Sequence, residues 1–369
     1  MTEVKTRFDV VGSYLRPEVL KQAKKDFAEG KISADQLKTI QQEEIKKLVE
    51  KQKAAGLHYI TDGEFSRTFW HLDFFWGFEG IEHHPTQKGV QFHGEVAILD
   101  DTYLVGKLKA KAHPFVEDYR FLKSLESDGV EARQTIPSPS QLFQQLNIPS
   151  NYESTRKFYK DNDELISDIA KAYQEVIKQF YDAGCRYLQL DDCTWGAIVG
   201  DAAAERYKSL GLNLSEVKEQ LLKVNNLALE NKPADLHVAT HICRGNYHST
   251  YFTSGPYDSV ADYVFAKENV NALYLEYDDE RSGGFSPLAK VSEDKQVILG
   301  LITSKRPELE DKATVIERIK EAAKYVPLNR LSLCPQCGFA SCEIGNKLTE
   351  GEQWAKIKLV REIAEAVWE

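Results

Sequence analysis

The residues of this chain best suited to bind a metal are one histidine, two cysteines and one glutamate. They lie near the ends of three separate strand-like runs, as His241, Cys243, Glu276 and Cys337. His241 and Cys243 are two positions apart, so on a strand their side chains project to the same face. Imidazole, thiolate and carboxylate groups are all good zinc ligands. Because a metal-bound thiol is deprotonated outright, a site of this composition indicates zinc chemistry on a thiol.

Strand-like and helix-like segments alternate along almost the whole chain. The strand candidates are residues 8–14, 58–65, 132–137, 187–193, 236–243, 272–277, 296–302 and 331–334. Several are continuous apolar runs, which are typical of buried parallel strands. Between them lie amphipathic helix candidates, at residues 36–53 (capped by Ser33), 163–181, 214–229, 311–324 and 349–367. Their apolar residues recur at helical spacing.

This alternation predicts an α/β fold in which residues 1–369 form a single (β/α)8 TIM barrel. Residues 89–112 break the rhythm, and we expect them to form an antiparallel hairpin inserted after the second strand, around Asp100 and Asp101. An open doubly wound sheet is the main alternative. The sequence contains neither a G-x-G-x-x-G nor a Walker motif that would support it.

Polar residues fall repeatedly at the carboxyl ends of the expected strands, where barrel enzymes carry their functional groups. Besides the four metal-ligand candidates, these residues are Gly12-Ser13 after the first strand, Asp62-Gly63-Glu64 after the second and Asp191-Asp192 after the fourth. This convergence of chemically useful side chains favours one site at one end of a barrel over scattered surface residues.

The composition excludes several classes of function. The net charge is −10, so a nucleic-acid partner, which needs clustered Lys and Arg, is not expected. The polar N-terminus lacks the apolar stretch of a signal peptide, and no apolar run approaches the length of a membrane span. Six cysteines, three of them within residues 334–342, do not form a secreted disulfide pattern. We therefore expect a cytoplasmic protein with reduced thiols; its oligomeric state is left open.

Over nearly its full length the chain resembles the C-terminal catalytic barrel of the cobalamin-independent methionine synthases, and specifically their short, single-barrel members. The resemblance rests on several strand-end motifs. These are Val11-Gly12-Ser13-Tyr14 with Arg16-Pro17, Asp62-Gly63-Glu64-Phe65-Ser66-Arg67, Gln189-Leu190-Asp191-Asp192, Thr240-His241-Ile242-Cys243, Glu276 and Pro335-Gln336-Cys337-Gly338. The last three are similar to the zinc-ligand set of the family and are the most specific.

The resemblance implies a mechanism. His241, Cys243, Glu276 and Cys337 would hold Zn²⁺, and the thiol of homocysteine would join the metal and attack the methyl group of 5-methyltetrahydrofolate, giving methionine. By the same analogy, Ser13, Glu64 and Asp191 would bind the amino-acid end of homocysteine. The expected partners are therefore small molecules, namely homocysteine or another thiol and methylfolate or another methyl donor.

Two departures from the family pattern lie close to the expected substrate. Where the family has a histidine after the seventh strand as an acid, this sequence has Lys305, which would donate a proton weakly at neutral pH unless burial lowered its pKa. The motif that begins at Gln189 ends in Asp192-Cys193-Thr194-Trp195 rather than in Glu-Pro-Ala. Because this chain has one barrel where full-length members have two, the methyl donor is also open.

Other interpretations stand beside these. Cys334 and Cys337 could belong to a zinc knuckle or a redox pair, although the other cysteines supply no second C-x-x-C. Cys185 and Cys193 are interpreted as core residues, and Asp192 as either a substrate contact or a structural acid. Alternative functions are the same zinc chemistry with another donor or acceptor, a zinc and homocysteine sensor without turnover, and a related decarboxylase barrel without zinc.

Overall fold

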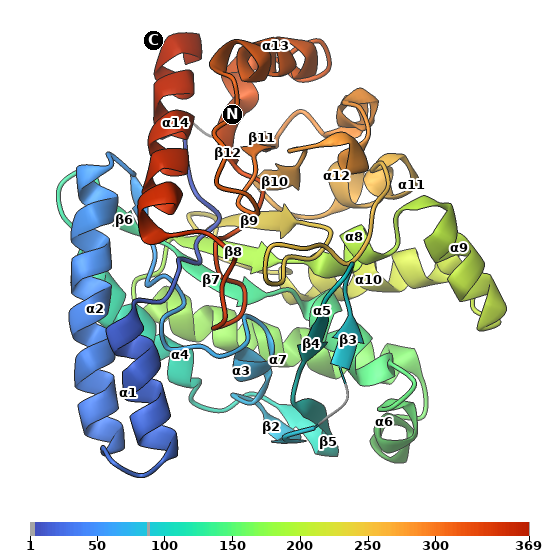
Figure 1. Cartoon of the computed structure of the whole chain (residues 1–369). Coiled ribbons are helices and arrows are strands. Elements are labelled where there is room, and N and C mark those ends of the chain that lie inside the picture. The colour runs from blue at the N-terminus through green and yellow to red at the C-terminus, as the bar shows by residue number, and fades with distance from the viewer. Residues whose placement is uncertain (1–3, 87–88, 369) are drawn as a thin grey trace.

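The computed structural model describes residues 4–86 and 89–368. In this part of the chain, six strands form one parallel sheet in the order β12-β11-β10-β9-β8-β7 (Figure 1). They are β7 (Gln134–Pro137), β8 (Tyr187–Asp191), β9 (His237–Ile242), β10 (Ala272–Glu276), β11 (Gln296–Ile302) and β12 (Leu331–Pro335). All but two of their residues are buried, which agrees with the continuous apolar runs expected of parallel strands.

Shorter extended segments lie next to the two outer strands of this sheet. β1 (Tyr59–Ile60) pairs in parallel with β6 (Glu131–Ala132), which comes just before β7 in the chain. Phe8 forms a parallel bridge with Leu333 of β12, and Ser13 forms one with Gly63. The first two predicted strands therefore pair with their neighbours through single bridges and one two-residue ladder, and not through long ladders.

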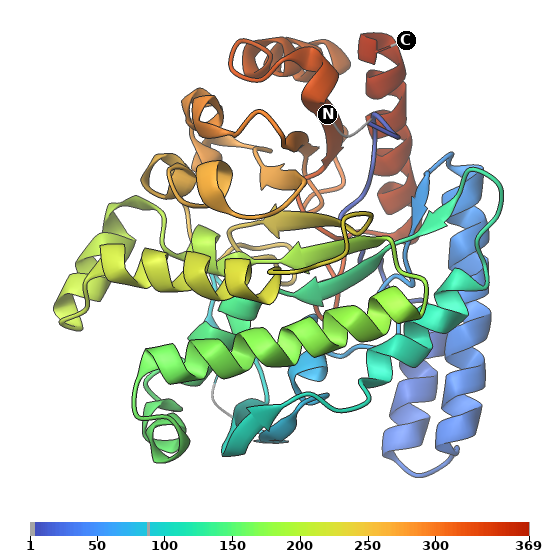
Figure 2. The same ribbon diagram turned by 180° about the vertical axis from the view of Figure 1, so that it is seen from behind.

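Helices follow the strands and cover the outside of the sheet. Their bounds are α1 (Glu18–Ala28), α2 (Ala34–Ala54), α3 (Leu72–Phe75), α4 (Pro114–Lys123), α5 (Pro139–Asn147), α6 (Tyr152–Phe158), α7 (Asn162–Asp182), α8 (Cys193–Ala197), α9 (Gly200–Ser209), α10 (Leu214–Ala228), α11 (Asp258–Ala261), α12 (Val264–Lys267), α13 (Lys312–Ala322) and α14 (Glu350–Trp368). Short 3₁₀ turns occupy Glu280–Ser282, Ser286–Lys290 and Leu328–Arg330. Figure 2 shows α7 and α10, which pack on each other, crossing the back of the sheet.

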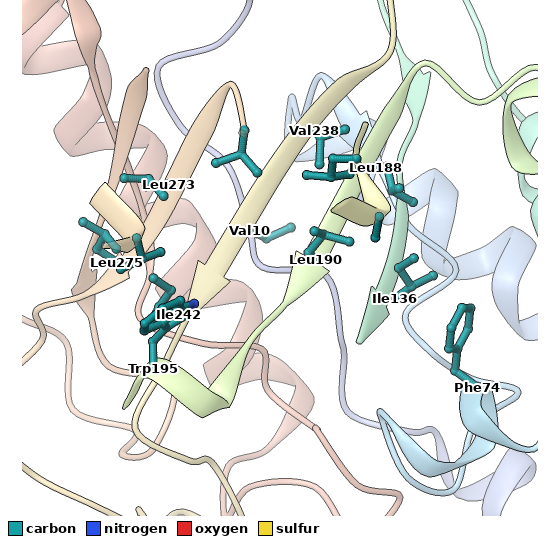
Figure 3. Close-up of a cluster of buried hydrophobic side chains, with 14 of the residues drawn as sticks. Val10, Phe74, Ile136, Leu188, Leu190, Trp195, Val238, Ile242, Leu273 and Leu275 are labelled. Carbon is teal, nitrogen blue, oxygen red and sulfur yellow. The ribbon is translucent and has the colours of Figure 1, made fainter. Parts of the chain in front are cut away.

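The local signals for the longest helices agree with the structure. Ser33 caps α2 in a capping box, its hydroxyl accepting from the Gln36 amide while the Gln36 side chain accepts from the Ser33 amide. In α7, the apolar residues at helical spacing are the buried ones, from Leu165 to Phe180. The continuous core includes side chains from β8, β9 and α8, with Trp195 of α8 beside Ile242 of β9 (Figure 3).

Residues 79–109 pair differently from the expected hairpin around Asp100 and Asp101. β2 (Glu79–His84) pairs antiparallel with β5 (Asp101–Lys109), and β3 (Gly89–Gln91) pairs antiparallel with β4 (Val96–Ile98). The two strands that flank Asp100 thus belong to different pairs. The chain as a whole is an α/β fold with a parallel sheet and helices, as predicted.

Candidate metal and thiol-binding site

Three of the four predicted metal ligands lie together at the carboxyl end of the sheet. The ligand atoms of His241, Cys243 and Cys337 are all within 4.8 Å of one another, and all three side chains are buried. His241 is in the last part of β9, Cys243 follows it, and Cys337 follows β12. Ligand atoms of one tetrahedral zinc, with bonds of about 2.0–2.3 Å, are about 3.3–3.8 Å apart, so three atoms within 4.8 Å need only small movements to share one ion. The spacing and the donor types therefore both suit one zinc ion.

His241 is oriented by a carboxylate. Its Nδ1 lies 3.0 Å from Oδ1 of Asp191, and its Nε2 lies 3.3 Å from the carbonyl oxygen of Gln336. Metal-binding histidines commonly have one ring nitrogen on a carboxylate, as Nδ1 is here, and Nε2 would exchange the Gln336 carbonyl for the ion. Burial lowers the pKa of His241, but the hydrogen bond to Asp191 and the charge of Cys243 outweigh it and raise the pKa to about 9.

A third sulfur lies beside the three predicted metal ligands. The Sγ atoms of Cys193 and Cys243 are 3.2 Å apart, and Cys193 is only half-buried. Hydrogen bonds from the Cys193 and Cys337 thiols hold the pKa of Cys243 well below its usual range. The interpretation of Cys193 as a core residue is therefore wrong: the strand ends at Asp191, and Cys193 begins α8 with its side chain at the site.

Glu276 is at the end of β10, as predicted, but its carboxylate is already engaged by cations and an amide. Its Oε1 is 3.0 Å from Nη1 of Arg281, and its Oε2 accepts from the backbone amide of Arg244 at 2.8 Å. Nζ of Lys305 is 4.0 Å from the same Oε1. Glu276 is completely buried and is not part of the three-residue cluster.

Lys305, the predicted acid, is also buried next to this cluster. Its Nζ makes no hydrogen bond with any residue in the described part of the chain, although it lies close to Glu276. The hydrogen bond with Cys243 and burial raise the pKa of the Cys337 thiol, and the positive charge of Lys305 opposes this rise. Lys305 is therefore placed to act on a negatively charged group at the site.

Ser13 and Glu64, predicted to bind the amino acid, line the same cavity as the metal ligands. Oε1 of Glu64 lies 3.1 Å from Arg67 and accepts from Thr135 at 3.0 Å. Its other oxygen, Oε2, is buried without a hydrogen-bond partner among residues 4–86 and 89–368. A buried, unpaired carboxylate oxygen facing a cavity is well suited to receive an ammonium group.

The position of Ser13 depends on a glycine of the predicted motif. A Cβ on Gly338 would lie 1.9 Å from Oγ of Ser13, so only glycine fits there. Ser13 also accepts a hydrogen bond from the Ala340 amide at 3.3 Å and pairs with Gly63. The cavity walls thus join three strand ends through backbone contacts.

Asp192 is a structural acid rather than a substrate contact. Its Oδ2 accepts from Ser140 at 2.6 Å and from Asn225 at 2.9 Å, and its Oδ1 accepts from the Thr194 amide at 2.9 Å. Asn225 also donates to Glu268. Burial and the charge of Asp192 raise the pKa of Glu268 to about 8. This buried network ties α5, α8 and α10 together beneath the site.

The cavity has a volume of about 220 Å³ and is enclosed on one side by apolar side chains. Val90, Phe92, Ala97 and Leu99, in and beside the β3–β4 pair, line it together with the predicted metal ligands. Trp70 also lines it, whereas Phe74 and Phe75 of the same aromatic segment are completely buried in the core. The aromatic segment therefore contributes a cavity wall at one end and packing at the other.

The remaining cysteines do not form a second site. All six are free, and Cys334 is buried with Tyr59, Tyr187 and Tyr274 in a separate apolar cluster. Cys334 thus lies in a different environment from Cys337 despite its proximity in sequence. A zinc knuckle built on both residues does not match this arrangement.

Comparisons with known proteins agree with this site. The family model described as the cobalamin-independent synthase catalytic domain matches residues 6–113 and 148–366. The chain belongs to this family. The site motifs His241, Cys243, Glu276 and Cys337 lie within the second matched range. The predicted family is thereby confirmed, and the family supports a methyltransferase activity without identifying the donor or the acceptor.

Individual relatives cover almost the whole chain. The uncharacterized protein YxjG of Bacillus subtilis is 44% identical over 98% of this chain and 94% of its own length. A methionine synthase of Saccharolobus solfataricus is 25% identical over 89% of this chain and 87% of its own. A structure from Listeria monocytogenes, assigned to the vitamin-B12-independent methionine synthases, is 37% identical with a TM-score of 0.79, covering 100% of both chains. Among the described residues, no helix is long and apolar enough to cross a membrane.

Replacing Gly196 by alanine is expected to weaken zinc binding by at least about tenfold and to destabilise the fold by about 1–3 kcal/mol. A Cβ at Gly196 would lie 1.8 Å from the carbonyl oxygen of Cys243, so α8 or Cys243 must move. Competition with a chromogenic chelator measures the affinity, and urea unfolding measures the stability. Gly284→Ala is the matched control, because nothing lies within 4 Å of its Cβ. Equal zinc affinity and stability in the two variants would contradict this packing argument.

Proposed function

We propose that the chain is a zinc-dependent methyltransferase that transfers a methyl group from 5-methyltetrahydrofolate, or a related donor, to the thiol of homocysteine to form methionine. The observation that carries this proposal is the buried His241–Cys243–Cys337 cluster at the end of a cavity that Glu64 and Ser13 also line. A thiol-bearing amino acid suits such a cavity, because its thiol can reach the metal cluster while its ammonium and carboxylate groups reach Glu64 and Ser13. Zinc, when bound, supplies deprotonation and orientation of the thiol.

The chain's own residues would bind and orient the substrate. The unpaired Oε2 of Glu64 would receive the ammonium group, and Ser13 would donate to the carboxylate. Asp191, also in the cavity wall, would hold His241 and face the same ammonium group. Lys305, next to Cys337 and Glu276, would donate a proton to a bound group or stabilise negative charge on it. His241, Cys243 and Cys337 would hold the zinc, and Glu276 is the fourth ligand that the family resemblance implies.

We also infer that the sheet closes as a single (β/α)8 barrel over residues 1–369. Support comes from the bridge of Phe8 to Leu333 on the β12 side and from the pairing of β1 with β6 on the β7 side. The bridge between Ser13 and Gly63 joins these two edges. The antiparallel pairs of residues 79–109 would then be an insertion after the second strand, over the mouth of the site.

A methyl donor related to 5-methyltetrahydrofolate is a second candidate, because the cavity wall offers few cations for a polyglutamate tail. Among the described residues that line the cavity, Arg244 is the one with a lysine or arginine side chain. It is buried and donates hydrogen bonds to Gly255, Glu276 and Ser282. A folate with several glutamates would therefore find no unengaged lysine or arginine among the residues that line the cavity. Methyl transfer should be assayed with the zinc-loaded enzyme and homocysteine, comparing 5-methyltetrahydrofolate bearing one and three glutamates. Methionine formation supports the proposal, and absence of methionine with either donor counts against this donor class.

Affinity for methionine is expected to rise about tenfold between pH 6 and pH 8, because Glu64 must be ionised to bind the ammonium group. Burial raises the pKa of Glu64 to about 7; nearby Asp191 and Asp62 act in the same direction, while Arg67 and Arg16 oppose them. Below pH 7 the carboxyl is mostly protonated, so the attraction is lost as the pH falls. Methionine is the chosen probe because it has no thiol proton to lose.

Titration calorimetry of the zinc-loaded protein would measure this affinity. In Glu64→Gln, we expect methionine to bind about 10- to 100-fold more weakly at pH 8, because a hydrogen bond to a charged group is removed. The variant should also show little change between pH 6 and pH 8. A pH profile in Glu64→Gln that matches the unmodified protein would assign the titration to another group.

A further inference from the structure

The β3–β4 pair forms one wall of the cavity without belonging to the central sheet. Among the strands of the described residues, β3 and β4 pair with each other and with no other strand, and Figure 1 shows them apart from the six parallel strands. The side chains of this segment that line the cavity are apolar, namely Val90, Phe92, Ala97 and Leu99. On the opposite face of β4, Val96 and Ile98 are 49% and 48% exposed. A wall that no further strand supports can move as one unit.

The tip of this pair, residues 92–95, is fastened to the loop that follows β9. The His93 amide donates to the carbonyl of Tyr251 at 2.9 Å, and the hydroxyl of Thr250 donates to the carbonyl of His93 at 2.5 Å. The ring of Phe92 packs against that of Tyr247, with the centroids 5.3 Å apart. Because this loop begins just after two of the predicted metal ligands, these contacts hold the tip over the site.

Glu95 adds a charged contact between the tip and two other segments. Its Oε1 accepts from Nζ of Lys347 at 2.7 Å and lies 3.2 Å from Nδ1 of His248. His248 belongs to the loop after β9, and Lys347 precedes α14. The side chains of Glu95 and Lys347 are 31% and 54% exposed, so this contact can break without leaving a buried charge. Glu95 is thus placed as a latch that can open.

The loop that receives the tip is held in a strained conformation. His248 and Ser249 have φ values of 45° and 68°, in the left-handed region that residues other than glycine seldom adopt. The Ser249 amide donates to Asn346 at 2.9 Å, and the Lys347 amide donates to the Ser249 hydroxyl at 2.7 Å. Strain of this kind is typical of ligand clamps and switch regions. The segment that holds the strained loop therefore also supplies the cation for Glu95.

We propose that Glu95 is a positioning residue that keeps the β3–β4 pair closed over the cavity through Lys347 and His248. When closed, the pair excludes water and holds a substrate beside the predicted metal ligands; when open, it lets substrate enter and product leave. This inference deepens the proposed function, on which its kinetic part rests. The closure itself is a property of the fold and can be measured without turnover.

Thiol labelling of the full chain without substrate tests the closure. Cys193 and Cys342 are half-buried, line the cavity and lie outside the three-residue cluster, so they report access to it. Their rates of reaction with iodoacetamide can be followed separately by mass spectrometry of the peptides. In Glu95→Gln, we expect both rates to rise about 3- to 10-fold, because loss of a partly exposed ion pair increases the open fraction. Lys347→Met should act in the same direction.

Lys290→Met is the matched control. Lys290 forms an ion pair with Asp262 at 2.8 Å, its side chain is 55% exposed, and it does not line the cavity. The completely buried thiol of Cys185 should keep its labelling rate in every variant, which separates local opening from general unfolding. Equal rates for the cavity cysteines in Glu95→Gln and Lys290→Met would overturn the proposal, as would a matching rise at Cys185.

Steady-state kinetics tests the positioning role. In Glu95→Gln, we expect the KM for homocysteine to rise about 3- to 10-fold while kcat is not lowered, because the cavity closes less often on its substrate and the chemical step is unchanged. A lower kcat at unchanged KM would overturn the positioning role. A protein without methyl transfer overturns the proposed function and leaves the labelling result to decide the closure, whereas equal labelling overturns this inference alone.

Discussion

Replacing Cys243 by alanine is expected to abolish stoichiometric zinc binding and methyl transfer together. Cys243 is the sulfur that contacts both Cys193 and Cys337, and it lies within 4.8 Å of the ligand atoms of His241 and Cys337. Loss of a group that merely supports a metal ligand costs about 10- to 100-fold in affinity, so loss of a ligand should cost more than about 100-fold. Metal analysis after dialysis and the homocysteine methylation assay measure the two effects.

The control for this variant is Cys185→Ala, which removes another completely buried thiol. Cys185 lies outside the site, where its sulfur donates to the carbonyl of Tyr187 at 3.2 Å. It should lower stability modestly and leave zinc binding unchanged. A Cys243→Ala protein that keeps one zinc per chain and turns over homocysteine would place the reactive site elsewhere.

Replacing Asp9 by asparagine is expected to destabilise the fold by about 3–5 kcal/mol, the largest effect on stability that we expect from a single substitution. Arg133 and Asp9 form an ion pair at 2.7 Å in which both side chains are almost completely buried. Tyr274 donates to the same oxygen of Asp9 at 2.6 Å. Without Asp9, the guanidinium of Arg133 would lie in the protein interior with no negative partner, surrounded by tyrosine rings.

Urea-induced unfolding would measure the change in the free energy of unfolding. Lys5→Ala is the matched control, because Lys5 and Glu131 form an ion pair whose side chains are 49% and 39% exposed. Breaking that exposed pair should cost about 0–1 kcal/mol. The double replacement Asp9→Leu with Arg133→Met should recover much of the loss, since it leaves no unpaired charge. An Asp9→Asn protein as stable as Lys5→Ala would show that the buried pair contributes little.

The clustering of three predicted metal ligands could be anticipated because of strand geometry. The carboxyl ends of parallel strands meet at one edge of a sheet, so His241 and Cys243 after one strand and Cys337 after another are brought together by the topology. Predicting that these three side chains lie together required no knowledge of loop conformation. Glu276 was also placed at the correct strand end, but its partner Arg281 comes from a following turn whose path the pattern does not specify.

Cys193 was missed because the strand before it was expected to extend too far. Asp192 follows the last residue of β8 and caps α8, and an aspartate before a helix is a known start signal that could have ended the strand earlier. The network that makes Asp192 structural could not be foreseen, because Ser140 and Asn225 come from distant helices. The pairing of β5 with β2 was likewise hidden, since alternation identifies a strand but not its partner.

The central claim is that zinc in this chain binds the substrate's thiol directly. Zinc X-ray absorption with selenohomocysteine, in which selenium replaces the reacting sulfur, tests it independently of how many cysteines the protein contributes. We expect one zinc per chain and the appearance of a zinc–selenium contribution once the selenol is added, absent in Cys243→Ala. Stoichiometric zinc whose surroundings contain no selenium at saturating selenohomocysteine would contradict the claim, as would a purified protein without zinc.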